Sequence, residues 1–383
     1  MRTVMTSSEG LADLSVLHIG AGRHDPLDSN HSTFDIWREL AKGFRKYTVV
    51  CRSNQASYSR IELGNLTVCF LPSKFESEAE FLVLQALAVS IGAEVRADVV
   101  VSQCPVRGGL AGTVLGRKIG SKLLSEMHGY EYFSDAKFGG SHWAIQKMTG
   151  YPLKHSCRIR ALSEGMKSRI ISRYGDELES KIVCLPPRVD VEKFSQFKRC
   201  WSIKATPKLI IVGSVNERKG QVSLVTTLLN SNLDFVIWIV GDGPDVPRVR
   251  KIANDLGGSE RVKFFGQITH SKLAQLLPLA DVMIQFSNNE GTPRAIMEGM
   301  VVGLPIITSN AGFCSDVVEN ETQGFVLGAE PTSEIVERLD ILLGDENLRS
   351  RMGQAGRKRA VEEFNANSVF DRYRTLIRET AAG

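Results

Sequence analysis

Short apolar runs alternate with segments of helical periodicity along most of this 383-residue chain. In the first half the runs are L-S-V-L-H-I, Y-T-V-V-C, L-T-V-C-F-L, D-V-V-V-S, K-L-L-S-E-M, I-R-A-L-S and K-I-V-C-L-P. Between two of them Phe34, Ile36, Trp37, Leu40 and Phe44 recur at helical spacing. Apolar strands that alternate with helices predict parallel sheets covered on both faces.

The alternation breaks once, around Pro186 and Pro187, and then restarts. The later runs are K-L-I-I-V-G, F-V-I-W-I-V-G, V-K-F-F-G, D-V-M-I-Q-F, P-I-I-T and G-F-V-L, followed by a helical tail from about residue 331. A chain of this length exceeds what one core usually spans. We therefore predict an α/β protein of two doubly wound domains, residues 1–190 and 205–365. We expect a last helix at about 366–383 to pack back on the first domain.

Composition excludes several classes of protein. The net charge of +4 comes without a basic, aromatic-rich block, so no nucleic-acid partner is expected. The seven cysteines are odd in number and never form C-x-x-C, which is typical of reduced thiols in a cytosol. The N-terminus is polar and no run of about 18 apolar residues occurs. These features predict a cytoplasmic protein and leave peripheral contact with the inner face of a membrane open.

Glycines or serine follow four predicted strands of the second half, at Gly213, Gly241, Gly266 and Ser287. In an open parallel sheet, ligands bind in the crevice outside the carboxyl ends of the strands. Glycines end strands in many proteins, but charged residues lie on these same loops. The four loops therefore predict one binding site, which faces the other domain.

The stretch S-N-N-E-G-T-P-R-A-I-M-E-G, residues 287–299, places two carboxylates around a helix start. Thr292 suits the N-cap and Pro293 the first helical position. The free amides of that helix would form a seat for an anion such as a pyrophosphate. Glu298 would reach past the phosphates in one direction and Glu290 in the other. A nucleotide diphosphate-sugar, with ribose hydroxyls, a diphosphate and a sugar, has that layout.

A basic turn follows the first strand of the second half, in V-G-S-V-N-E-R-K-G-Q. Arg218 and Lys219 stand where a strand gives way to a helix, which suits a phosphate. Taken alone, a solvated basic turn would be the better explanation of them. The nearby V-G-D-G-P-D contains a lone G-x-G, which is weak evidence and also fits a tight turn.

Together these motifs resemble the retaining glycosyltransferases of family 4, also called glycosyl transferases group 1. The residues that carry the resemblance are Gly213 to Lys219-Gly220, G-D-G-P, V-K-F-F-G, A-D-V-M-I-Q-F-S, E-G-T-P-R-A-I-M-E, G-L-P-I-I-T, M-H-G-Y-E and K-I-V-C-L-P-P-R-V-D. The resemblance covers about residues 98–330. It implies the GT-B fold, in which two Rossmann-like domains face a central cleft. It also implies transfer of a hexosyl group from a nucleotide-diphosphate sugar to an acceptor hydroxyl.

The resemblance also implies roles for individual residues. Lys219 would pair with the donor diphosphate, Glu298 with the ribose hydroxyls and Glu290 with the transferred sugar. His128 would bond the donor sugar from the first domain. The expected catalytic residues are thus Glu290, His128 and Lys219. The remaining predicted contacts to the nucleotide-sugar are Gly20, Ser214, Arg218, Gly241, Gln267, Ile268, Gly291, Thr292 and Pro293.

Two departures qualify this assignment. Ser214 stands where the family usually has Arg, and Arg218 is the candidate to replace that charge. No Asp-x-Asp pair occurs, which the metal-dependent glycosyltransferases of the other major fold use. We therefore expect no metal and no cofactor, with protein donors and cations stabilising the leaving phosphate.

The acceptor and the exact donor remain open at this level. Family context favours a UDP-sugar such as UDP-glucose and a lipid-linked or saccharide acceptor in cell-surface polysaccharide or glycolipid synthesis. A non-catalytic subunit that binds the nucleotide-sugar is one alternative. A dinucleotide-dependent oxidoreductase is another, although the first strand lacks a G-x-G-x-x-G that enters a helix.

Overall fold

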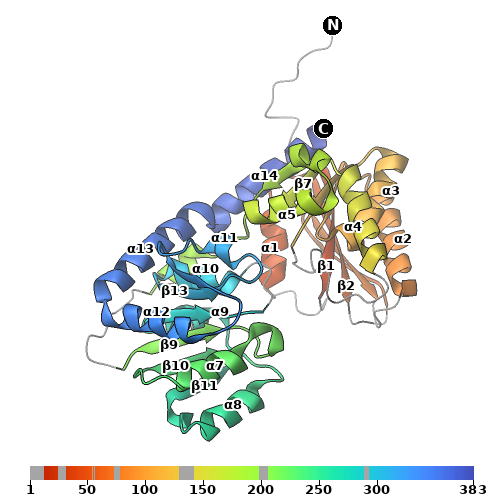
Figure 1. The fold of residues 1–383 in the computed structure, drawn as a ribbon. Helices are drawn as coiled ribbons and strands as arrows, with labels where there is room; N and C mark the ends of the chain where they lie inside the picture. Colours follow the sequence, from red (N-terminus) through yellow and green to blue (C-terminus); the bar gives the residue numbers. More distant parts are fainter. Residues whose placement is uncertain are drawn as a thin grey trace. The chain divides into compact units, whose positions relative to one another are not determined.

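The chain divides into two compact units, drawn in Figure 1. The structure is a computed structural model that describes residues 13–24, 32–53, 55, 57–72, 78–128, 142–197, 206–288 and 293–383. Unit 1 holds the described residues up to Leu185 and returns with Phe370–Gly383, while unit 2 is Pro186–Val369. The segment 186–197, predicted to end the first domain and begin a connection, lies within unit 2. There Val189 N–H donates to the Phe364 carbonyl at 2.8 Å.

Unit 1 is built on one mixed sheet, in the order β3-β4-β2-β1-β5-β6-β7-β8. All of its neighbouring strands are parallel except β3 and β4. The strands are β1 (Ser15–Arg23), β2 (Lys46–Ser53), β3 (Ser59–Leu63), β4 (Leu66–Pro72), β5 (Val99–Ser102), β6 (Lys122–Glu126), β7 (Arg158–Ala161) and β8 (Ile182–Cys184). The helices are α1 (Ser32–Ala41), α2 (Glu78–Glu94), α3 (Leu110–Ile119), α4 (His142–His155), α5 (Glu164–Tyr174) and the end of α14 (Ala366–Ala382).

Alternate residues of these strands serve two layers of helices. Leu17 and Ile19 of β1 share a buried cluster with Leu115 of α3. On the other face, the ring of Phe34 in α1 lies 6.2 Å from that of Phe70 in β4. The strands read as nearly continuous apolar runs because both of their faces are covered.

Unit 2 is a fully parallel sheet in the order β11-β10-β9-β12-β13-β14. Its strands are β9 (Lys208–Val212), β10 (Val236–Val240), β11 (Val262–Gly266), β12 (Val282–Gln285), β13 (Ile306–Ser309) and β14 (Gly324–Leu327). Its helices are α6 (Val191–Ser195), α7 (Gln221–Leu229), α8 (Val246–Asp255), α9 (His270–Leu276), α10 (Arg294–Val301), α11 (Cys314–Val317), α12 (Ser333–Gly344) and α13 (Glu346–Glu363). The first residues of α14 also belong to this unit.

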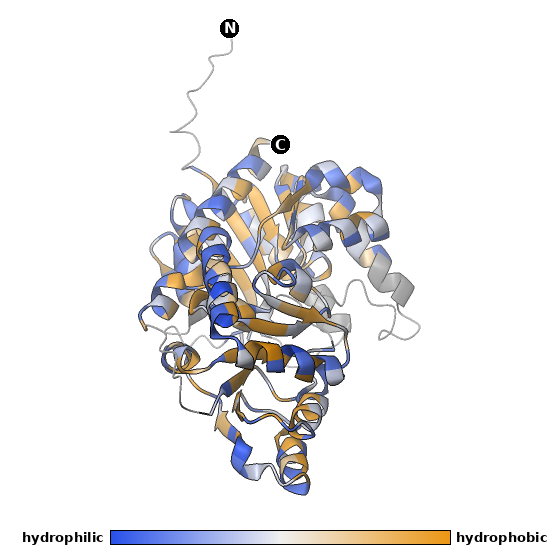
Figure 2. Ribbon diagram, turned by 60° about the vertical axis from the view of Figure 1, so that its left-hand side comes forward, coloured by the Kyte–Doolittle hydropathy of each residue, from blue (hydrophilic) through white to orange (hydrophobic). Residues whose placement is uncertain are grey.

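Two apolar clusters fill the two faces of this second sheet. Ile210 and Val212 of β9 pack with residues of α9, α10 and α13. Leu209 and Ile211 of the same strand pack with residues of α7, α8 and α12. Figure 2 shows the same division, since the strands are mostly hydrophobic while the helices carry hydrophilic residues on one side. The predicted α/β architecture with two Rossmann-like sheets is confirmed.

Every apolar run quoted from the sequence forms a strand, but the edge strand β3 was not predicted. Only two of the five residues in its sequence S-R-I-E-L are apolar, and its burial alternates between intermediate and exposed. A signal was present, because Gly64 and Asn65 form the two-residue turn that joins β3 to β4. Asn65 fixes that turn by donating to the carbonyls of Ala41 and Phe44 at 2.8 and 2.9 Å.

The position of α10 depends on a close approach to α13. Gly303 follows α10 with a φ of +80°, and a Cβ on Gly353 of α13 would lie only 2.1 Å from the Gly303 carbonyl oxygen. One turn later, a Cβ on Gly356 would meet Met300 side-chain atoms at an ordinary 3.5 Å.

Substitution of these two glycines should therefore have opposite effects. We expect Gly353→Ala to lower the free energy of unfolding by about 2 kcal/mol, because backbone atoms must separate. We expect Gly356→Ala to be neutral or to raise it by up to about 1 kcal/mol, because alanine favours the helix. Urea unfolding of both variants measures the difference, and equal effects would contradict this account of the α10–α13 contact.

Candidate functional site

The strand order of unit 2 reverses between β9 and β12, which are neighbours in the sheet. From β9 the chain proceeds outward through β10 and β11, and it later continues from β12 to β13 and β14 on the other side. The connections that leave β9 and β12 therefore diverge and leave a crevice at their carboxyl ends. The loop after β9 carries Ser214, Arg218 and Lys219, and the loop after β12 leads into α10. This crevice is our candidate site in unit 2.

The loop after β9 is fixed by its own hydrogen bonds. The Asn216 side chain accepts from the Lys219 N–H at 3.2 Å, and Gln221 donates to the Ser214 carbonyl at 2.9 Å. A Cβ on Gly213 would lie 3.6 Å from Lys219 Cε and 3.9 Å from its Nζ. The Lys219 ammonium thus lies over the carboxyl end of β9, while Arg218 and Ser214 are exposed.

The loops that follow β9 and β12 are joined to each other. Asn288 donates from its main-chain N–H to the Arg218 carbonyl at 2.8 Å and from its side chain to the Glu217 carbonyl at 3.1 Å. A Cβ on Gly220 would lie 2.6 Å from the Phe286 carbonyl oxygen. The segment that begins at Asn289 and ends at Thr292 therefore starts from an anchored residue. Glu290, Gly291 and Thr292 lie outside the described residues.

Gly241 has a packing reason to be glycine. Its φ is +134°, and a Cβ there would lie 2.0 Å from the Gly213 carbonyl oxygen. Its N–H also donates to the Gly266 carbonyl at 2.8 Å. The G-x-G turn after β10 thus supports the loop after β9, as the tight-turn interpretation suggested. A contact between Gly241 and a nucleotide-sugar stays a prediction.

Helix α10 begins one residue later than the sequence suggested. Pro293 is the N-cap, with φ −77° and ψ 79°, and Arg294 is the first helical residue. The prediction that Pro293 occupies the first helical position is therefore wrong. The prolyl residue has no N–H to offer, so the first amide available at this terminus is that of Arg294.

Glu298 is the buried acid of this site. It lies one turn beyond Arg294 on α10 and is only 8% exposed. Burial raises the pKa of its carboxyl to about 7, although the charges of Arg294 and Lys193 oppose that shift. Removing a carboxylate from water disfavours its charged form, and here that effect exceeds the attraction of the two cations.

His270 is a neighbour of Glu298 that the sequence analysis did not single out. Its Nε2 lies 3.6 Å from Glu298 Oε1. Burial, followed by the charges of Arg294 and Lys193, lowers the pKa of His270 below its usual 6.5. His270 is thus mostly neutral at pH 7, so this contact is no ion pair there. The signal in the sequence is the T-H-S-K start of α9, where Thr269 caps the helix.

Gln267 and Ile268 follow β11, the edge strand of this sheet. Ile268 is partly buried and packs against the apolar cluster that contains α9 and α10. Both residues therefore lie on the far side of β10 from the loop after β9. That position is compatible with the predicted contact to a base.

Gly20 and His128 belong to unit 1. Gly20 lies near the end of β1, where the strand order of that sheet reverses between β1 and β5. His128 follows β6, and its Nε2 lies 2.9 Å from Glu126 Oε2. Glu126 was not predicted, since a buried acid inside an apolar strand carries no motif.

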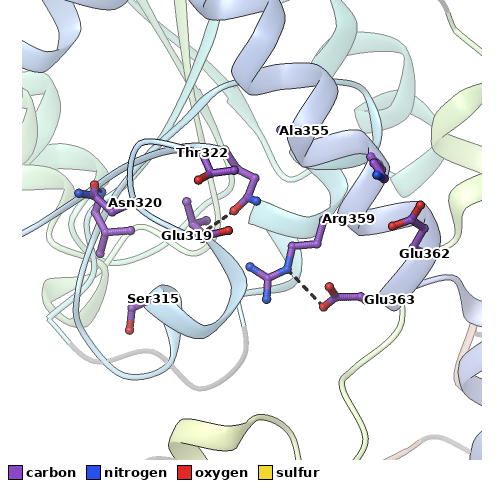
Figure 3. Close-up of a pocket in the computed structure, with 12 residues that line it drawn as sticks. Ser315, Glu319, Asn320, Thr322, Ala355, Arg359, Glu362 and Glu363 are labelled. Carbon is purple, nitrogen blue, oxygen red and sulfur yellow. Dashed lines mark hydrogen bonds and ion pairs between the residues drawn. The ribbon is translucent and has the colours of Figure 1, made fainter.

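A separate hollow of about 870 Å3 lies between α13 and the residues around α11 and β14. Thr322 and Gln323 of its lining come directly before β14, at the opposite end of the sheet from the crevice. Figure 3 shows Arg359 crossing it toward Glu363. Arg359 also donates to the carbonyls of Asp316 and Val317, at the carboxyl end of α11. We therefore interpret the Arg359 side chain as a structural support.

Two further observations concern the described residues. Among them, no group of three or more His, Cys, Asp or Glu side chains is arranged to hold a metal ion. Nor is any described helix long and apolar enough to cross a membrane.

Known proteins resemble this chain in sequence. Residues 194–359 match the family model described as Glycosyl transferases group 1. N-acetyl-alpha-D-glucosaminyl L-malate synthase of Bacillus anthracis is 22% identical over 273 residues, covering 70% of each chain. A GDP-mannose-dependent alpha-(1-6)-phosphatidylinositol monomannoside mannosyltransferase of Mycobacterium tuberculosis is 25% identical over 279 residues, covering 67% of this chain and 70% of its own.

Solved structures share the fold. Anabaena Alr3699/HepE in complex with UDP superposes with a TM-score of 0.76 at 16% identity, covering 96% of this chain and 100% of its own. Sucrose-phosphate synthase of Thermosynechococcus elongatus gives a TM-score of 0.79 at 17% identity, covering 96% and 99%. These neighbours are GT-B glycosyltransferases, so the predicted fold class is confirmed.

The raised pKa of Glu298 predicts a pH-dependent cost to stability. Between pH 4.5 and pH 7 the unfolded chain ionises this carboxyl while the folded chain keeps its proton, so stability falls as pH rises. From pH 5 to pH 8 we expect the wild type to lose about 2 kcal/mol more unfolding free energy than Glu298→Gln does. Urea unfolding at both pH values measures this difference.

Glu334→Gln, which changes an exposed acid of α12, is the matched control and should follow the wild type. If wild type and Glu298→Gln show parallel pH profiles, the proposed burial of an acid at this position is wrong.

Proposed function

Since the chain carries a Glycosyl transferases group 1 domain at residues 194–359 and has the GT-B fold of a glycosyltransferase, we propose its reaction in more detail. It transfers a hexosyl group, with retention of configuration, from a UDP-linked sugar such as UDP-glucose to an acceptor hydroxyl. The proposed setting is the synthesis of a cell-surface polysaccharide or glycolipid, at the cytoplasmic face of a membrane. We propose that the reaction needs no metal ion and no cofactor.

One observation carries the donor site. At the switch point between β9 and β12, Lys219 and the start of α10 flank the same crevice, and a buried acid follows within α10. Phosphate binding is favoured by a cation together with the free amides of a helix N-terminus. A carboxylate is acceptor-only, which suits the paired hydroxyls of a ribose. Lys219 and α10 therefore hold the diphosphate, and Glu298 binds the ribose.

The chemistry follows from where charge develops. As the anomeric C–O bond breaks, the sugar becomes oxocarbenium-like and the diphosphate leaves as an anion. Lys219 and the amides at the start of α10 stabilise that leaving group, since the main chain of Lys219 is held by Asn216 and the amides belong to a helix. The exposed Arg218 supplies the second cation, because Ser214 stands where the family usually has an arginine. The leaving phosphate accepts the proton of the acceptor hydroxyl.

The two remaining roles come from sequence. Glu290 lies beside the transferred sugar, and His128 bonds that sugar from the first domain. For the acceptor, one of the relatives reported above is a phosphatidylinositol monomannoside mannosyltransferase. We therefore propose a lipid-linked or saccharide acceptor and peripheral contact with the membrane.

A panel of nucleotide-sugars tests the donor. We expect UDP-glucose or another UDP-sugar to raise the melting temperature of the wild type, because a ligand of the native state stabilises it. Lys219→Ala should lose about tenfold or more of its affinity and of its transfer rate. Lys251→Ala, an exposed cation of α8, is the matched control and should behave as wild type.

Several outcomes would redirect the proposal. If GDP-mannose alone raises the melting temperature, the donor carries guanine in place of uracil. If a nucleotide-sugar binds but no acceptor is glycosylated, the protein is a non-catalytic subunit. A response to nicotinamide dinucleotides would support the oxidoreductase. The anomeric configuration of the product, measured by NMR, tests retention. The transfer rate in the presence of EDTA tests whether the reaction needs a metal.

Donor affinity should also depend on pH through Glu298. With a pKa of about 7, about one tenth of this carboxyl is ionised at pH 6 and about nine tenths at pH 8. If the carboxylate binds the ribose, the Kd for the nucleotide-sugar should fall about tenfold between these pH values. Calorimetry with UDP-glucose suits this test, because its diphosphate does not titrate in this range.

Glu298→Gln should bind more weakly and with little dependence on pH. A variant that retains the wild-type pH dependence would remove Glu298 from the ribose site.

A further inference from the structure

A buried acid stands directly behind the candidate histidine of unit 1. Glu126 is the last residue of β6 and is 2% exposed. Its Oε1 accepts from Arg160 Nη1 of β7 at 2.9 Å, and its Oε2 lies 2.9 Å from His128 Nε2. Tyr373 of α14 and His18 of β1 lie close enough to this carboxylate to interact with it electrostatically.

Glu126 is ionised in spite of its burial. Burial alone would raise the pKa of its carboxyl, but His128, Arg160 and His18 together hold that pKa well below its usual range. The Arg160 guanidinium is itself fixed, since its Nε donates to the Leu185 carbonyl at 3.1 Å and it lies 5.0 Å from the centre of the Tyr373 ring. A buried charge with this many partners does not change orientation readily.

An ionised carboxylate decides which nitrogen of His128 carries the proton. A carboxylate only accepts hydrogen bonds, so the Nε2 that faces Glu126 must be the N–H. In the neutral ring, Nδ1 then has a lone pair. The His128 side chain is 36% exposed, in contrast to the buried Glu126. The ring is thus held from behind through one nitrogen.

We propose that Glu126 is a positioning residue that holds His128 in the Nε2–H tautomer and leaves Nδ1 as a hydrogen-bond acceptor for a sugar hydroxyl. The inference rests on the proposed function for the identity of the ligand, but not for the tautomer. Arg160 and Tyr373 keep the carboxylate in place. His128 would accept from a sugar hydroxyl through Nδ1 without having to choose between tautomers.

The tautomer can be measured without any assay of activity. In protein labelled with 15N-histidine, long-range proton–nitrogen spectra distinguish a protonated Nε2 from a protonated Nδ1. His128→Ala assigns the signals. We expect the wild type at pH 8 to show His128 as the Nε2–H tautomer. A ring protonated at Nδ1 would overturn the proposal, whatever the enzyme catalyses.

Variants of Glu126 test its role. Glu126→Gln keeps the shape but can donate as well as accept, so we expect a mixture of tautomers for His128. Glu177→Gln, which removes an exposed acid paired with Lys154, is the matched control and should leave the spectrum unchanged. An unaltered His128 spectrum in Glu126→Gln would also overturn the proposal. Should Glu126→Gln not fold, the wild-type spectrum still decides.

Activity provides a second measurement. Glu126→Gln should lower kcat by about tenfold or more, with the KM for the donor changed by less than about threefold. A fall in folded protein alone would lower the rate in proportion to the amount of native enzyme, so circular dichroism corrects for it. A normal kcat alongside a changed tautomer would refute positioning for catalysis, whereas no turnover in the wild type would contradict the proposed function.

Discussion

Both units depend on parallel strands that are buried on two faces. A parallel pair cannot be closed by a tight turn, so each strand is followed by a connection that crosses the sheet. All carboxyl ends of such strands point to one edge, and the loops that leave them gather there. The fixed lysine after β9, the start of α10 after β12 and the histidine after β6 all occupy such positions. The positions of these residues are thus a consequence of the connectivity that parallel sheets require.

The loops at that edge are ordered by neighbours more than by their own sequence. Gly241 and Gly220 permit backbone approaches that a Cβ would prevent, and Asn288 ties one loop to the next. Groups arranged in this way need not reorganise when a charge appears between them, which is the condition for electrostatic catalysis.

Much of this could be predicted from sequence, for a physical reason. Strands buried on both faces appear in the sequence as continuous apolar runs, and their ends are marked by glycines. The fold and the positions of the loops of unit 2 could therefore be predicted. The half-exposed β3 left only its Gly64-Asn65 turn as a signal. Glu126 could not be found, because its significance lies in partners that are distant in sequence, and His270 left only the capped start of α9 as a signal. The start of α10 differed by one residue, because proline usually takes the first helical position but here is the N-cap.

Helix α14 has a consequence for how the chain is handled. It supplies Tyr373 to the group that surrounds Glu126, and its Arg374 donates to the Glu39 carbonyl at 2.8 Å. Tyr373, Ile377 and Thr380 of α14 are therefore part of the interior of the first unit. Deleting this helix would expose to water the buried charges of Glu126 and Arg160, which support a histidine far away in the sequence.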